Sequence, residues 1–267
     1  MIDKDIKYKS LTVDDFGKDC YKEIAKGFFI HKDITDLAQP IFRYMSFEHL
    51  LSMLSKKELY VANRSSFCDL SERGWKEKTK NVFPLSPIYQ NKKETKRIGT
   101  DTYNRWKASY NICISCWSYD KHQNPKRPKE IVSENYLMWR TYAFHNIGCR
   151  IETTIGDLIK EIQQSKIPYD ILFANIEYLK DEYMSGNLQN DLFTKPSYYF
   201  GEQEMRFCIL CQEGKVSLKI NPFEMIKGVL ISPFITRGFS SFLVEQLKAT
   251  YTDWNIPIQK SHVMEFF

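Results

Sequence analysis

The sequence lacks the short motifs that mark the common nucleotide-binding and hydrolytic sites. It contains no G-x-G-x-x-G turn, no G-x-x-x-x-G-K-[ST] loop, no G-x-S-x-G elbow and no H-E-x-x-H pair. These absences exclude the usual Rossmann, P-loop, α/β-hydrolase and zinc-peptidase signatures. Any enzymatic activity must therefore rest on a different arrangement of side chains.

Long apolar runs are also missing. No window approaches the roughly 18 apolar residues of a transmembrane helix. The N-terminal segment MIDKDIKYKSLTVDD has no apolar stretch of the kind found in secretion signals. We therefore expect a cytoplasmic protein that does not contact a membrane.

Cysteine is present, but its pattern does not suggest disulfides. The chain has seven cysteines, an odd number, and most lie in apolar runs. Two C-x-x-C pairs, Cys113/Cys116 and Cys208/Cys211, have a spacing found in zinc sites. Each pair lies in a strand-like run, however, where residues three apart point to opposite faces. We interpret these cysteines as buried structural thiols and predict no metal site.

Composition favours a globular α+β protein. Hydrophobic residues make up 43% of the chain and aromatic residues 15%, which is ample for a core. We found no internal repeat and no low-complexity linker, and short apolar segments alternate irregularly with helical patterns. We predict an N-terminal helical extension over 1–39, with a helix at 13–27, and one main domain over 40–267.

Hydrophobic periodicity places most elements of the main domain. Strands are predicted at 41–45, 59–62, 111–119, 149–153, 173–179, 205–211, 216–220, 228–231 and 257–262. Helices are predicted at 47–56, 100–110, 134–145, 155–164, 182–192 and 240–249.

A basic insertion interrupts the main domain at about 73–107. Its first part, 73–97, carries eight Lys and Arg residues against two Glu residues, with Trp75, Phe83 and Tyr89 interleaved. A second basic loop spans 120–130, and the net charge of the chain is +5. Basic residues with aromatics can bind a nucleic-acid backbone and stack on its bases. The alternative is an insertion whose charges only face solvent.

A polar cluster precedes the apolar run at 207–211. If this stretch is a strand, Glu202, Glu204 and Arg206 line one face, because alternate residues share a face. Two adjacent carboxylates raise one pKa and a nearby guanidinium lowers it, and such clusters concentrate at functional sites. The alternative is a salt-bridged strand on a solvated face.

Arg43 is the second unusual polar residue, because it lies within the apolar strand predicted at 41–45. A buried arginine needs an anionic partner. The sequence leaves open whether this partner is Glu202, Glu204 or the phosphate of a ligand.

These residues belong to a longer pattern that resembles a bacterial and phage-associated domain family catalogued only as a domain of unknown function. The resemblance covers roughly 41–262. Its residues are Arg43-Tyr44, Phe67-x-Asp69-x-x-Glu72, Cys116-Trp117-Ser118, Met138-Trp139-x-x-Tyr142, Gly148, Lys195, Tyr199-x-x-Glu202-x-Glu204-x-Arg206, Ile231-Ser232-Pro233 and Ser261. The chain departs from the usual pattern at Cys68, Leu70 and Tyr199, where the family has Asn, Pro and Trp.

The order of these motifs in turn resembles the ADP-ribosyltransferase fold, which has an Arg in the first strand, a Ser in the second and an E-x-E element. This resemblance implies an α+β fold with a split β-sheet core, peripheral helices, and NAD as substrate in the cleft. It implies that Glu204 stabilises an oxocarbenium-like transition state and that Glu202 orients or deprotonates the acceptor. The residues it implies for NAD binding are Arg43, Tyr44, Trp117, Ser118 (or Ser115), Tyr142 and Arg206.

The expected function is therefore that of an NAD-dependent ADP-ribosyltransferase, a toxin or antiphage effector. RNA is favoured as acceptor through the basic loops, while a protein acceptor or simple NAD hydrolysis remains open, and an antitoxin or chaperone could restrain the protein. Two alternatives stay open. One is a metal-dependent nuclease that uses Asp69, Glu72, Glu202 and Glu204. The other is a non-enzymatic binding module in which Glu202, Glu204 and Arg206 form a structural network with Arg43.

Overall fold

The computed structural model describes residues 11–67, 112–119, 134–143, 147–179, 192–211 and 215–263. Asp69, Glu72, the basic insertion at 73–107, the whole loop at 120–130, the helix predicted at 100–110 and all but the last residue of the helix predicted at 182–192 lie outside these residues. Within the described part, no helix has the length and apolar character needed to cross a membrane.

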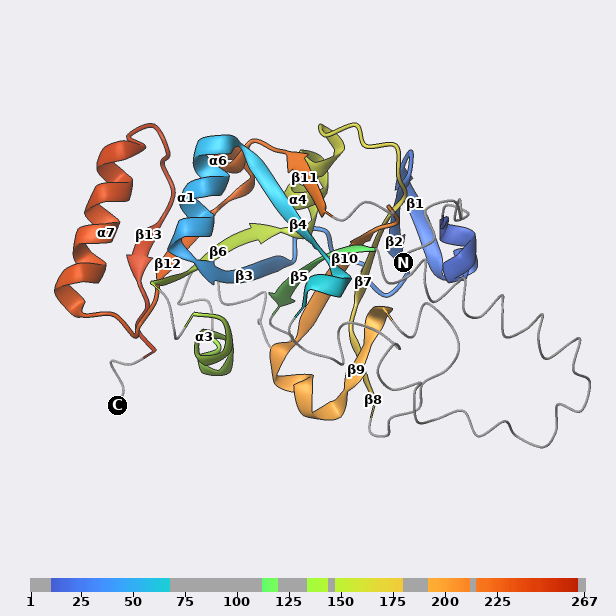
Figure 1. Cartoon of the computed structure of the whole chain (residues 1–267), viewed down its shortest axis with the longest axis horizontal. Coiled ribbons are helices and arrows are strands. Elements are labelled where there is room, and N and C mark those ends of the chain that lie inside the picture. Colours follow the sequence, from blue (N-terminus) through green and yellow to red (C-terminus); the bar gives the residue numbers. More distant parts are fainter. Residues whose placement is uncertain are drawn as a thin grey trace, which may run out of the picture.

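Among the described residues, an eleven-stranded mixed sheet runs through the molecule (Figure 1). Its main path is β1 (Tyr21–Ala25), β2 (Phe28–His31), β7 (Ile171–Asn175), β10 (Glu204–Ile209), β5 (Cys113–Tyr119), β3 (Pro40–Ser46), β6 (Gly148–Thr154), β12 (Gly228–Ile231) and β13 (Ile258–Lys260). Strand β4 (Glu58–Asn63) leaves this path at β5 and carries β11 (Lys215–Lys219) at its other edge. Neighbouring strands are antiparallel except at β2–β7 and β12–β13. The chain is thus a mixed α+β protein.

Helices cover both faces of the sheet. Helices α1 (Phe47–Lys56), α4 (Ile155–Gln163) and α6 (Pro222–Met225) lie over one face, and α3 (Tyr136–Tyr142) lies against β3 on the other (Figure 1). Helix α7 (Arg237–Thr250) packs on β12 and β13 at one end of the sheet. Among the described residues, α3 is therefore the one α-helix beside the middle of the second face of the sheet.

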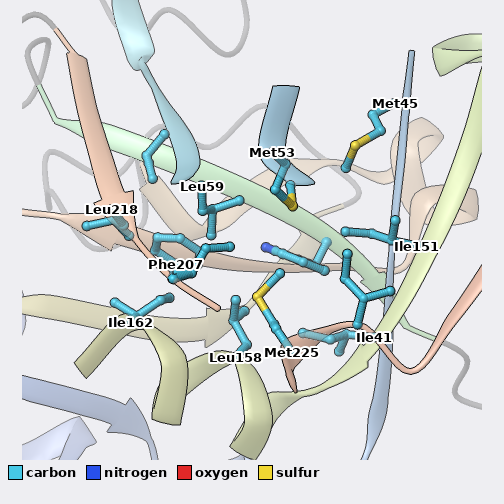
Figure 2. Close-up of a cluster of buried hydrophobic side chains, with 14 of the residues drawn as sticks. Ile41, Met45, Met53, Leu59, Ile151, Leu158, Ile162, Phe207, Leu218 and Met225 are labelled. Atoms are coloured by element: carbon cyan, nitrogen blue, oxygen red, sulfur yellow. The ribbon is translucent and has the colours of Figure 1, made fainter. Parts of the chain in front are cut away.

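The main core lies between the sheet and the first group of helices. Figure 2 shows side chains of the sheet meeting side chains of α1, α4 and α6. The labelled residues are Ile41, Met45, Met53, Leu59, Ile151, Leu158, Ile162, Phe207, Leu218 and Met225. Each large apolar side chain buried in this way stabilises the fold by about 1.5–3 kcal/mol.

The predicted helix 47–56 is confirmed as α1. Ser46 caps it by accepting a hydrogen bond from the backbone N–H of His49, and Lys57 ends it in the left-handed conformation. The predicted helix 155–164 is confirmed as α4, where the hydroxyl of Thr154 accepts from the N–H of Asp157. Capping and spacing fix both helices locally, which explains why sequence periodicity located them.

The predicted helix at 13–27 is wrong. The segment contains two short 3-10 turns, Val13–Phe16 and Lys18–Cys20, followed by the hairpin of β1 and β2. Gly17 separates the turns at φ 78°, a conformation that cannot continue a right-handed helix. Strand β2 pairs in parallel with β7, so the main sheet includes residues predicted as a helical extension.

The strand predicted at 173–179 divides into two. Strand β7 stays in the main sheet, while β8 (Glu177–Leu179) forms a separate parallel pair with β9 (Thr194–Pro196). The break is fixed at Ile176, whose N–H donates to the carbonyl of Glu204. The second pair brings Lys195, on β9, beside the start of β10.

Candidate functional site

The sheet opens at strand β5. Strand β3 pairs with β5 only at Ile41–Tyr119 and Phe42–Ser118, near the C-terminal end of β5. Strand β4 pairs with the same edge at the other end, where Ala62 and Asn63 face Ile114 and Cys113. Between these two contacts lies a cleft of about 200 Å³. Its lining residues are Phe42, Arg43, Tyr44, Ala62, Phe67, Ile114, Cys116, Trp117, Ser118, Met138, Tyr142, Glu202 and Glu204.

The cleft gathers all but one of the residues predicted for the site. These residues come from β3, β5, α3 and the segment around β10, which are far apart in sequence. They are Arg43, Tyr44, Trp117, Ser118, Tyr142, Glu202 and Glu204. Arg206, the remaining one, lies behind Glu204 with 1% of its surface exposed. It supports the site rather than lining it.

Arg43 projects toward the middle of β5. Its Nη1 donates to the hydroxyl of Ser115 at 3.1 Å, and its guanidinium lies 5.8 Å from the ring centroid of Trp117. The indole Nε1 of Trp117 donates to the same hydroxyl, also at 3.1 Å. Burial lowers the pKa of Arg43. Within the described residues, Arg43 forms no ion pair with a carboxylate.

The two glutamates reach the cleft through a turn. Glu202 ends the 3-10 helix Ser197–Glu202, Gln203 adopts a left-handed conformation at φ 44° and ψ 62°, and Glu204 begins β10. The carbonyl of Gln203 accepts from the N–H of Tyr119, which ties the turn to β5. The prediction that strand alternation aligns these side chains therefore holds for Glu204 and Arg206 but is wrong for Glu202.

Glu204 is held by two cations. Its Oε1 accepts from Arg206 Nε at 2.7 Å, and its Oε2 lies 2.6 Å from Lys195 Nζ. Arg206 is fixed in turn by donating from Nη1 to the carbonyl of Leu192. Burial alone would raise the pKa of Glu204, but the charges of Arg206 and Lys195 outweigh it and hold this pKa well below its usual range. Glu204 is therefore ionised at neutral pH.

Glu202 has a different environment. Its Oε1 accepts a hydrogen bond from the hydroxyl of Tyr142 at 3.1 Å, and its Oε2 accepts one from Lys195 Nζ at 2.6 Å. Burial raises the pKa of Glu202, and Lys195 offsets part of this effect. The pKa values of the two carboxyls are thus shifted in opposite directions, as in sites that divide the acid–base and electrostatic roles between two carboxylates.

Sequence reasoning missed the role of three residues at this site. Lys195 contacts both glutamates, Ser115 orients Arg43, and Cys116 lines the cleft although it was predicted as a buried thiol. The other cysteines of the two pairs, Cys113, Cys208 and Cys211, are buried as predicted. The signal for Lys195 was available: two carboxylates beside an apolar run need cations, and this lysine lies seven residues before the first.

Helix α3 borders the cleft and is anchored at both ends. Trp139 is fully buried and packs edge-to-face on Tyr44, with ring centroids 4.9 Å apart. The carboxylate of Glu134 accepts from Trp139 Nε1 at 3.0 Å, from the hydroxyl of Ser261 and from the N–H of His262. A second cavity, of about 310 Å³, lies beside this anchor and shares Phe42, Tyr44 and Ser118 with the cleft. Tyr44 and Ser118 therefore line both the cleft and the second cavity.

Gly148, which the sequence pattern includes, is required by the end of α3. A Cβ at this position would lie 2.2 Å from the Cβ of Ala143, closer than any real contact. This glycine lets β6 pass directly under the helix that carries Tyr142.

No protein-family model matches the chain, and no curated protein matches its sequence. What the chain does must therefore be inferred from the geometry of the cleft.

Proposed function

We propose that the protein is an NAD-dependent ADP-ribosyltransferase whose active site is the cleft at β5. One observation carries the proposal. Arg43 lines the same cleft as Glu202 and Glu204 but pairs with neither, because both carboxylates contact Lys195. The cleft therefore combines a cation that lacks an acidic partner among the described residues with an ionised carboxylate. This combination suits a ligand that bears a diphosphate and develops positive charge.

The aromatic residues of the cleft suit the rest of such a ligand. Tyr44, Trp117 and Tyr142 line the cleft around Arg43 and Glu202. Aromatic rings stack on planar heterocycles, such as the nicotinamide and adenine of NAD. The hydroxyl of Ser118 lines the cleft and donates to the carbonyl of Phe42 at 3.3 Å, so its oxygen can still accept a bond from a ribose hydroxyl.

The two glutamates suit the two halves of the reaction. When the bond between ribose C1′ and nicotinamide breaks, its electron pair leaves with nicotinamide and positive charge develops on the ribose. The ionised Glu204 stabilises that charge, as carboxylates do in glycoside hydrolysis. The acceptor forms the new bond to C1′ and its proton passes to Glu202, whose raised pKa suits a base. With water as acceptor, the same steps would release ADP-ribose.

The sheet topology supports the proposal as well. Strands β3 and β4 diverge from the same edge of β5, so that the cleft lies between two groups of strands. We propose that this opening is the split core of an ADP-ribosyltransferase-like fold. A role as a toxin or antiphage effector, RNA as acceptor, and restraint by an antitoxin or chaperone are parts of the proposal that depend on the basic segments 73–107 and 120–130, outside the described residues.

The alternatives receive less support from the same geometry. A nuclease would use Glu202 and Glu204 as metal ligands, yet Lys195 Nζ occupies the position between their oxygens. The described residues contain no group of three or more His, Cys, Asp or Glu side chains arranged around a possible metal position. The binding-module alternative predicted that Arg43 joins Glu202, Glu204 and Arg206 in a structural network. This part of the prediction is wrong, because Lys195 pairs with the glutamates and Arg43 bonds to Ser115 instead.

The test is incubation of the purified protein with NAD labelled in its adenylate, with RNA, DNA and cellular protein supplied separately. Transfer of label to one pool, with release of nicotinamide, is the expected result and identifies the acceptor class. Free labelled ADP-ribose alone would indicate a hydrolase. Intact NAD in every reaction would overturn the proposal.

A matched pair of variants separates catalysis from stability. Glu204→Gln keeps the shape of the side chain but removes its charge, and it should abolish nicotinamide release. Glu161 is the control, because it is also buried and accepts from the N–H of Asn221, but it lies in α4 and does not line the cleft. Glu161→Gln should leave the release of nicotinamide unchanged.

A further inference from the structure

Lys195 is the residue on which the two glutamates converge. Its Nζ lies 2.6 Å from Oε2 of Glu202 and 2.6 Å from Oε2 of Glu204. The side chain is buried, and its ammonium also lies 5.2 Å from the ring centroid of Tyr199. Lys195 does not line the cleft, so it acts on the glutamates from behind.

The two carboxylates depend on this lysine to different degrees. Glu204 keeps a second cation, Arg206, on its other oxygen. The other oxygen of Glu202 contacts the neutral hydroxyl of Tyr142, so among the described residues Lys195 is the single cation that pairs with Glu202. Removal of the lysine charge would therefore affect Glu202 more strongly than Glu204.

We infer that Lys195 is a positioning residue that keeps Glu202 ionised and aimed into the cleft, so that Glu202 rather than Glu204 accepts the proton of the incoming acceptor. This inference rests on the proposed function. The ammonium keeps its three protons throughout, and the proton released by the acceptor ends on Glu202. Lys195 therefore acts through Glu202 and does not touch the reacting atoms.

The test compares Lys195→Met with the unchanged protein by two measurements. The first is the carboxyl titration of Glu202 and Glu204 by ¹³C NMR without NAD, assigned with Glu202→Gln and Glu204→Gln. The second is the pH dependence of nicotinamide release. An opposite charge at this distance shifts a carboxyl pKa by about 1–3 units. In Lys195→Met we expect the midpoint of Glu202, and the acidic limb of the activity profile, to move up by at least about one unit.

Lys219→Met is the matched control. Lys219 Nζ also lies 2.6 Å from a carboxylate oxygen, that of Glu58, but its side chain is 72% exposed and lies on β11. This variant should leave both titrations and the activity profile unchanged. An unchanged midpoint for Glu202 in Lys195→Met would overturn the inference.

Two further measurements keep the inference testable if Lys195→Met does not fold. Lys195→Arg retains the charge, so the midpoint of Glu202 should stay close to that of the unchanged protein. In the unchanged protein, Glu202 should titrate at a higher pH than Glu204, and coincident titration would overturn the inference. Because the NMR titration uses no NAD, an inactive protein whose Glu202 midpoint still moves would contradict the proposed function alone.

Discussion

The hydroxyl of Tyr142 donates a 3.1 Å hydrogen bond to Oε1 of Glu202, although 44% of the tyrosine is exposed. The ring thus lies at the rim of the cleft while its polar end reaches the buried acid. Helix α3 and the turn before β10 are joined at this point, and the position of Glu202 depends on both.

Tyr142→Phe should weaken catalysis with little effect on folding. A hydrogen bond to a charged group contributes about 1.5–3 kcal/mol, so nicotinamide release should fall by roughly tenfold or more. The exposed ring loses no packing, and the thermal midpoint should stay close to that of the unchanged protein. Steady-state kinetics with calorimetry checks both, and a full rate in the variant would show that this hydrogen bond does not serve the reaction.

Arg43→Met should reduce NAD affinity. Loss of the cation that faces the diphosphate should cost at least about 1.4 kcal/mol, which is tenfold in Kd by titration calorimetry. Stability should change little, because no carboxylate of the described residues loses an ion-pair partner. Arg140→Met is the control, since Arg140 is exposed on α3 and does not line the cleft. Equal NAD affinities for the two variants would show that Arg43 is not part of the binding site.

Gln203→Gly should separate stability from activity. A residue with a side chain costs about 1–2 kcal/mol in the left-handed conformation, so glycine should raise the free energy of unfolding. The freer turn should hold Glu202 and Glu204 less firmly, and turnover should fall. Lys57, at φ 54° after α1, provides the comparison. Lys57→Gly should give a similar gain in urea unfolding while turnover stays constant.

Stability should depend on pH through the two glutamates in opposite ways. The pKa of Glu204 is lowered on folding, so its contribution is present at neutral pH and is lost as the pH falls through the folded-state pKa. The pKa of Glu202 is raised, so its contribution is complete at acidic pH and declines as the pH rises through the folded-state value. Urea unfolding over about pH 3–8 measures both.

The corresponding amides identify which glutamate is responsible for each change. Glu204→Gln should lose the acid-induced destabilisation, and Glu202→Gln should lose the decline toward neutral pH. If both variants kept the pH profile of the unchanged protein, neither shift would contribute to folding.

Sequence periodicity located the elements that are determined locally. Helix α1 and strand β6 were predicted to within about two residues, because the cap of α1 and the apolar patterns of both segments are visible in the local sequence. The hairpin of β1 and β2 could not be found in this way. Its burial comes from pairing with β7, more than a hundred residues later, and a pattern within 13–27 contains no signal of that contact.

The site residues that could be predicted are those whose residue type is unusual for their position in the sequence. Arg43 in an apolar strand and the pair Glu202 and Glu204 are unusual at any position, so they could be selected without the fold. Lys195 could be singled out only as a nearby cation, because its contact with both glutamates depends on the β8–β9 pair and on the left-handed turn at Gln203. Ordinary residues acquire special roles only when tertiary structure brings them together.

Strand β5 links the two walls of the cleft. Strands β3 and β4 each hold it through two residue pairs, on the same edge and at opposite ends. Strands β3 and β4 therefore form the two walls of the cleft, and both are attached to β5. The twist of β5 sets the distance between these two walls. A substitution on the buried face of β5, such as at Cys113, could thus alter ligand affinity without lying in the cleft lining.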